Sequence, residues 1–235
     1  GGDRFSAVLR LLELPPYQLD QWHLPVAVLL GLFAVVFTFL FAFLMKTFHQ
    51  LMAPLHDRPI LRCTGIGLLI GLLGMAMPLT LFLGSEGLLE VVEARAELGI
   101  GFLVLSVLLK IVALTIVLAA GFIGGPIFPL FFVGGTMGVV LWQIFPGIPL
   151  MMAVGCLMAA VPCAVVPFPA TLAVVVLLIT GTPVVNAIPV LTAALTAHFV
   201  FKGLVLSNPA VAGQRFRDID AALQEAEDVQ PEALV

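Results

Sequence analysis

A segment rich in glycine and proline interrupts the least charged part of this chain. Residues 119–129 read AAGFIGGPIFP, and they lie within a stretch from Ile111 to Phe201 that contains no Asp, Glu, Lys or Arg. Inside a bilayer, backbone amides without partners are so costly that a broken helix survives only where it is buried in protein or lines a polar cavity. The break is therefore the strongest candidate for a functional site in the sequence.

Main-chain amides at this break could bind an anion. A helix that begins near Pro126 leaves the N–H groups of its first turn unpaired at the positive end of the helix dipole, where they bind an anion without a cationic side chain. Proline suits a first turn at positions 126 and 129. Gly121, Gly124 and Gly125 allow unusual backbone angles and the close approach of a ligand. The alternative is structural, because Gly and Pro in membrane helices also make kinks and packing contacts.

The composition indicates an integral membrane protein. The 235 residues are 61% hydrophobic and only 10% charged, whereas a soluble domain carries about 25% charged residues. The charged residues cluster at 1–23, 46–62, 86–97 and 202–232. They form no basic stripe interleaved with aromatic residues, so nucleic-acid binding has no support.

Long apolar segments predict an all-α, polytopic fold. The predicted helices cover residues 24–45, 60–83, 98–120, 126–144, 150–165, 168–180 and 184–206. The first is long enough to span about 30 Å of hydrocarbon. The fifth and sixth are short and cut by prolines, which is typical of the discontinuous helices of transporters. Residues 85–97 are predicted to form a short amphipathic connector at the membrane surface.

The distribution of Lys and Arg predicts the topology and the division of the chain. The basic loop 46–62 should be cytoplasmic, and the acidic connector 84–97 should face outside. Residues 1–23 are then an extracellular-side flank, residues 24–206 a transmembrane domain, and residues 207–235 a cytoplasmic tail. The predicted location is the cell membrane, crossed several times.

The sequence offers no pattern for catalysis, a metal or another cofactor. Cys63, Cys156 and Cys163 lie in apolar segments without CxxC spacing, and the four histidines are scattered. The uncharged region holds no Ser-His-Asp, Cys-His or paired-carboxylate arrangement, so we expect no enzyme and no catalytic residue.

The residues around the break resemble a known family. The run from Lys110 to Gly134, KIVALTIVLAAGFIGGPIFPLFFVG, is similar to the CLC chloride channels and Cl⁻/H⁺ exchangers, where a basic residue, a Gly/Ser-rich break and a GxFxP motif follow one another. Residues 169–181, PATLAVVVLLITG, Ile188-Pro189 and residues 78–90, PLTLFLGSEGLLE, resemble further stretches of that family. The resemblance covers roughly residues 20–210 and matches only the second half of a CLC subunit.

This resemblance implies a fold, a function and partners. The fold would be the second half of an inverted repeat with discontinuous, tilted transmembrane helices, usually within a homodimer. The function would be transmembrane transport of chloride or another halide or small anion, as a channel or a proton-coupled exchanger. The first half of the subunit, which carries the family's gating glutamate and Ser-containing motif, is absent from this chain. The alternative is a non-transporting structural or regulatory membrane subunit that keeps the CLC-like half-fold.

The resemblance also implies which residues contact the anion. The anion-binding residues would be Gly124, Gly125, Pro126, Ile127, Phe128 and Pro129. Carried over position by position, the two contacting amides of the family fall on Pro126 and Ile127. Pro126 has no amide proton, so a slide by one residue would let Ile127 and Phe128 donate instead, and we expect that pair.

Three further residues are possible secondary contacts. Lys110 either shapes the electrostatic path of the anion, contacts it directly, or extends to an aqueous vestibule. The family also supplies a Tyr hydroxyl from its last helix, but the corresponding residues 207–211 contain no Tyr. Ser207 or Asn208 would provide a substitute donor, and the alternative for both is capping at the surface.

Overall fold

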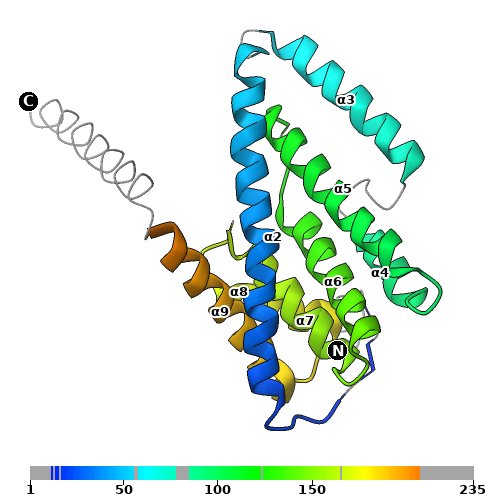
Figure 1. The fold of residues 1–235 in the computed structure, drawn as a ribbon, viewed down its shortest axis with the longest axis vertical. Helices are drawn as coiled ribbons and strands as arrows, with labels where there is room; N and C mark the ends of the chain where they lie inside the picture. Colours follow the sequence, from blue (N-terminus) through cyan, green and yellow to red (C-terminus); the bar gives the residue numbers. More distant parts are fainter. Residues whose placement is uncertain are drawn as a thin grey trace, which may run out of the picture. The chain divides into compact units, whose positions relative to one another are not determined.

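The computed structural model describes residues 12, 14–15, 17–55, 58–77, 85–122, 124–164 and 166–206, and this part of the chain contains helices and no strand. The elements are α2 (His23–Met52), η1 (Ala53–Leu55), α3 (Pro59–Ala76), α4 (Ser85–Glu93), α5 (Ile100–Ala119), α6 (Ile127–Ile144), α7 (Leu150–Ala160), η3 (Val161–Ala164), α8 (Pro169–Thr180), η4 (Val184–Asn186) and α9 (Ala187–Leu206). The chain divides into two compact units, residues 1–198 and 199–235. The arrangement described below is that of the first unit (Figure 1).

The all-α fold class predicted from the sequence is confirmed. Among the described residues, four helical segments are long and apolar enough to cross a membrane: His23–Leu55, Ile100–Ala119, Ile127–Ile144 and Val184–Val205. The segments predicted to be short, α7 and α8, are short, because Pro162 falls just after α7 and Pro169 begins α8. The predicted tail 207–235 and most of the flank 1–23 lie outside the described residues.

One helix is longer than the sequence pattern predicts. The first helix was expected to end at residue 45, but α2 continues to Met52 and passes into η1. Residues 46–52 carry polar side chains but no Gly or Pro, so nothing in the backbone stops the helix before Pro54. The predicted loop 46–62 is therefore mostly helical, and the connection between α2 and α3 is short.

Helix α6 is the central helix of the first unit, and glycines allow its neighbours to approach closely. It packs against α4, α5 and α7, and residues 129–140 are buried. A Cβ on Gly138 would lie 2.5 Å from Val154 Cα of α7, and one on Gly134 would overlap the carbonyl oxygen of Leu157. Small residues that bring two backbones together are the usual basis of helix packing in lipid, where the hydrophobic effect does not drive helices together.

Polar contacts between segments hold the end of α7. Thr38 of α2 donates a hydrogen bond to the carbonyl oxygen of Val161 at 3.1 Å. Cys163 Sγ lies 3.4 Å from the carbonyl oxygen of Ala194 in α9. Val161 and Cys163 belong to η3, so this short helix is attached both to α2 and to α9.

The two ends of α5 contact different parts of the fold. At its C-terminal end, buried Ile116, Ala119 and Ala120 form one hydrophobic cluster with Met52 of α2 and Ile66 of α3. At its N-terminal end, the connection from α4 contacts the C-terminal end of α6. The α2–α3 connection and the α4–α5 connection therefore lie at opposite ends of α5 (Figure 1).

Candidate functional site

Helix α5 ends at the glycine break with a complete C-terminal cap. Gly121 adopts the left-handed conformation, with φ of +86°. Its N–H donates to the carbonyl oxygen of Leu118 at 3.0 Å, and the N–H of Phe122 donates to that of Val117 at 3.3 Å. These two bonds form a Schellman motif, in which a left-handed residue, usually glycine, turns the chain out of the helix. Of the three glycines predicted to have unusual angles, only Gly121 has positive φ, whereas Gly124 and Gly125 do not.

Helix α6 begins where the sequence predicts. Pro126 is its N-cap residue, and Ile127 and Phe128 are its first two residues. The bond that opens the helix runs from the N–H of Leu130 to the carbonyl oxygen of Pro126 at 3.1 Å. The N–H groups of Ile127 and Phe128 precede that bond and have no acceptor within the helix, and Pro129 has no N–H. Two consecutive backbone donors therefore stand at the start of α6.

The segment directly before these two donors is open in the described part of the chain. A Cβ added to Gly124 or to Gly125 would meet no described atom within 4 Å. The side chain of Phe128 is 42% exposed, Pro126 and Ile127 are half-buried, and only Pro129 is buried. The six predicted anion-binding residues thus form one continuous segment, and its outer side is not covered by the described part of the chain.

Lys110 is buried between α5 and α6 rather than at the break. Its side chain is 2% exposed, and Nζ lies 5.3 Å from the centre of the Phe132 ring. Phe132 is five residues beyond Ile127, which corresponds to about 7.5 Å along a helix. The ammonium therefore lies beside a later turn of α6 than the one that carries the two donors without helical acceptors.

Tyr17, the single tyrosine of the chain, lies far from the break. The Tyr17 ring packs edge-on against the His23 ring, with 5.1 Å between the ring centres. The side-chain amide of Asn186 donates a hydrogen bond to the backbone carbonyl oxygen of Tyr17. His23 begins α2, whereas Met52, at the other end of that helix, packs near the break. A helix of 30 residues is about 45 Å long, so Tyr17 cannot replace the missing tyrosine of the last helix. Ser207 and Asn208 lie outside the described residues.

Arg62 is the residue near the break that the sequence did not identify. A Cβ on Gly121 would lie 3.0 Å from Arg62 Nη2, so the guanidinium contacts the break directly. Arg62 Nε is buried and has no hydrogen-bond partner among the described residues. The sequence placed Arg62 only as a topology marker in a cytoplasmic loop. Its position one helical turn before the buried Ile66 was the available signal that it faces α5.

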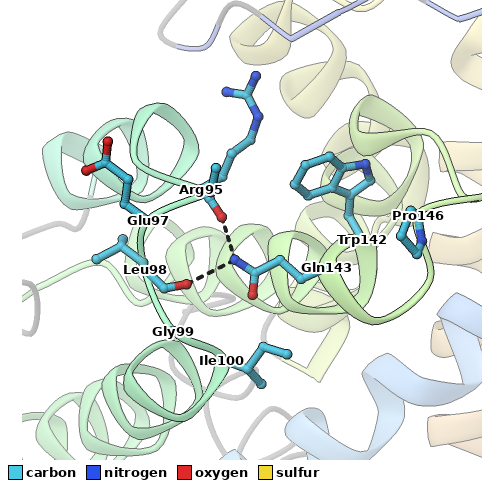
Figure 2. Close-up of a pocket in the computed structure, with 9 residues that line it drawn as sticks. Arg95, Glu97, Leu98, Gly99, Ile100, Trp142, Gln143 and Pro146 are labelled. Carbon is cyan, nitrogen blue, oxygen red and sulfur yellow. Dashed lines mark hydrogen bonds between the residues drawn. The ribbon is translucent and has the colours of Figure 1, made fainter.

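A cavity of about 440 Å³ lies at the opposite end of α5 and α6 (Figure 2). Gln143 of α6 points toward the α4–α5 connection, where its amide donates to the carbonyl oxygens of Arg95 and Leu98. Trp142 lies beside it, with its ring 6.0 Å from the Arg95 guanidinium carbon. These contacts attach the α4–α5 connection to the end of α6. Among the described residues, no group of three or more His, Cys, Asp or Glu could hold a metal ion.

A family model and several curated proteins match this chain. The model of the family described as "Voltage gated chloride channel" matches residues 5–202. The putative ion-transport protein YfeO of Escherichia coli (strain SMS-3-5 / SECEC) is 34% identical over 109 residues, which cover 46% of this chain and 26% of the relative. YfeO of Escherichia fergusonii matches equally well. The matched region thus spans about a quarter of the length of these curated relatives.

A solved structure has a similar fold. It is the crystal structure of a CLC-type fluoride/proton antiporter, with a TM-score of 0.63 and 21% sequence identity. The match covers 82% of this chain and 47% of that one. At this identity the match concerns the fold, and it includes about half of the antiporter chain.

Proposed function

The chain belongs to the voltage-gated chloride channel (CLC) family, and we propose that it forms the second half of a subunit that transports chloride or a similar small anion across the cell membrane. The anion is held at the start of α6 by the backbone amides of Ile127 and Phe128. Gly124, Gly125, Pro126 and Pro129 shape the same segment. The protein acts as a channel or a proton-coupled exchanger, and it is a multi-pass membrane protein rather than an enzyme.

The observation that carries this proposal is the pair of amides without helical acceptors at an open helix start. Partial positive charge at a helix N-terminus, equivalent to about half an elementary charge, attracts an anion and replaces part of its hydration shell. Conduction requires binding that is strong enough for entry but weak enough for release. Partial charges meet this requirement better than a lysine or arginine in direct contact would.

The open side of the break supports a subunit larger than this chain. Gly124, Gly125 and Phe128 are exposed in the described part of the chain, and the antiporter of similar fold is about twice as long as the matched region. We propose that the first half of the same subunit covers this side and completes the pathway, and that two such subunits form a homodimer.

Removal of a single backbone donor tests the site. Phe128→Pro deletes one N–H from the first turn, where no helical bond is lost. Phe128→Leu is the matched control, because it changes the side chain but keeps the amide. A hydrogen bond to a charged group contributes about 1.5–3 kcal/mol, so loss of one donor should weaken anion binding about 10- to 100-fold.

Two measurements decide the outcome. Chloride and fluoride flux from liposomes that contain the full-length protein should be present for Phe128→Leu and strongly reduced for Phe128→Pro. Isothermal titration with halides should show the same difference, and replacing Ile127 should change selectivity among halides. Folded Phe128→Pro protein with the flux and halide affinity of Phe128→Leu would remove this amide from the site.

A second function is favoured by one observation. Pro126 occupies a position at which the family places an amide donor, and it has no N–H to offer. A structural or regulatory membrane subunit that keeps the CLC-like half-fold but conducts no anion would tolerate that loss. Folded, full-length protein that neither binds halides nor supports flux would favour this alternative.

A further inference from the structure

We propose that Arg62 attracts the anion electrostatically to the open start of α6. This inference rests on the proposed function and adds to it a positioning residue that makes no direct contact with the bound anion. Its basis is the contact between the Arg62 guanidinium and Gly121, the residue at which the chain leaves α5 for the break.

The fold holds Arg62 in place through the hydrophobic cluster at the end of α5. Ile66, one turn after Arg62, is buried in this cluster with Ile116 and Ala119. Cys63 Sγ lies 3.8 Å from the carbonyl oxygen of Ala120. The first turns of α3 therefore lie against the last turn of α5, and the position of Arg62 follows from that packing.

The absence of a side chain at Gly121 lets the guanidinium approach the backbone of the break. A Cβ at this position would lie 3.0 Å from Arg62 Nη2 and 3.9 Å from the guanidinium carbon. On the far side of the break, Gly124 and Gly125 leave open space before α6 begins. A cation is thus placed at one end of the segment whose other end carries the two amides without helical acceptors.

Little in the described structure neutralises this charge. Arg62 Nε is buried and has no hydrogen-bond partner in the part of the chain that the structure describes. The chain from Ile111 to Phe201, which includes the break, has no carboxylate. The guanidinium also faces the carbonyl end of α5, where a cation is favourable. Arg62 could thus stabilise the end of α5 or attract the anion. These two roles predict different results in the experiment described next.

The experiment measures flux against chloride concentration for the full-length protein in liposomes. Arg62→Gln should raise the half-saturating chloride concentration about three- to tenfold, the order of effect expected for a partly screened unit charge that does not touch the anion. The maximal rate should change less than about twofold, because the amides that hold the anion remain. Arg62→Lys should restore the half-saturating concentration because it restores the charge. Arg58→Gln, an exposed residue one turn earlier, is the matched control and should resemble the unsubstituted protein.

Ionic strength gives a second measurement that needs no variant. Added salt with an impermeant anion should raise the half-saturating concentration of the unsubstituted protein toward that of Arg62→Gln, because salt screens an accessible charge. Equal half-saturation for Arg62→Gln and Arg58→Gln, a lower maximal rate that Lys does not restore, or no dependence on ionic strength would each overturn the inference. Absence of flux from the unsubstituted protein would instead overturn the proposed function, and with it this inference.

Discussion

Lys110 and Phe132 form a cation–π contact across the interface between α5 and α6, with 5.3 Å between Nζ and the ring centre. The lysine side chain is 2% exposed and lies on a helix long and apolar enough to cross a membrane. A desolvated cation over an aromatic face gains about 2 kcal/mol or more. The contact places a full positive charge inside the helical packing, near the start of α6 but not at it.

We expect neutralisation of Lys110 to weaken anion binding without changing selectivity. Lys110→Met keeps the length of the side chain and removes the charge, which lies beside Phe132, about 7.5 Å along the helix from Ile127. At that distance the half-saturating chloride concentration should rise about tenfold, while the order of preference among halides is retained. Liposome flux with chloride, bromide and fluoride measures both quantities, and Lys202→Met, an exposed lysine, is the control. A changed order of preference would show that Lys110 touches the anion.

Gly121 should tolerate substitution poorly, in contrast to Gly124. Gly121→Ala places a Cβ in a left-handed conformation, which costs about 1–2 kcal/mol, and that Cβ would also press on Arg62. Gly124→Ala adds the same methyl group where φ is not positive and no described atom lies within 4 Å. Thermal unfolding in detergent should therefore show a lower midpoint for Gly121→Ala only. Equal midpoints for the two variants would contradict the left-handed cap.

The close contact between α6 and α7 predicts a strong effect at Gly138. A Cβ there would lie 2.5 Å from Val154 Cα, so the two helices must separate or the backbone must shift. Overpacking of this kind costs about 1–3 kcal/mol. The matched control is Gly147→Ala, in an exposed turn with no atom within 4 Å. The same thermal measurement should show a loss for Gly138→Ala and none for Gly147→Ala.

The buried hydroxyl of Tyr17 predicts an alkaline instability. Burial raises the pKa of Tyr17 well above its ordinary value of 10.0, because the phenolate would lose its hydration. The unfolded chain then releases the proton before the folded one, so the stability contributed by neutral Tyr17 is complete below pH 10 and is lost as the pH rises further.

The variant Tyr17→Phe should remove this pH dependence. The hydroxyl has no hydrogen-bond partner among the described residues, so its loss should cost little at pH 8. At pH 11 the variant should unfold at a higher temperature than the unsubstituted protein. Tyr17 is the single tyrosine of the chain, so a difference of this kind cannot come from another phenol. Parallel stability curves from pH 8 to pH 11 would show that Tyr17 is hydrated.

Much of the fold and the location of the candidate site could be predicted from local signals. The helix start near Pro126 followed from a proline and glycine break within apolar sequence, and the structure begins α6 at Ile127. The proline-cut segments gave short helices, because a proline beyond the first turn removes a helical hydrogen bond and clashes with the preceding turn. The end of α2 was predicted seven residues too early. Polar side chains indicate where a helix leaves the apolar region, but they do not indicate where the helical backbone conformation ends.

Contacts between residues distant in sequence could not be predicted. Arg62 and Gly121 are brought together by the packing of α3 on α5. The residue pattern within either segment does not indicate that the two residues are in contact. The distance of Tyr17 from the break likewise depends on the length and direction of α2. The sequence by itself determined an all-helical membrane protein with a helix that begins at a glycine break, because hydrophobicity and backbone restrictions act locally. Only the tertiary structure decided which charges lie near that break, because electrostatic interactions depend on distance in space and not on distance along the chain.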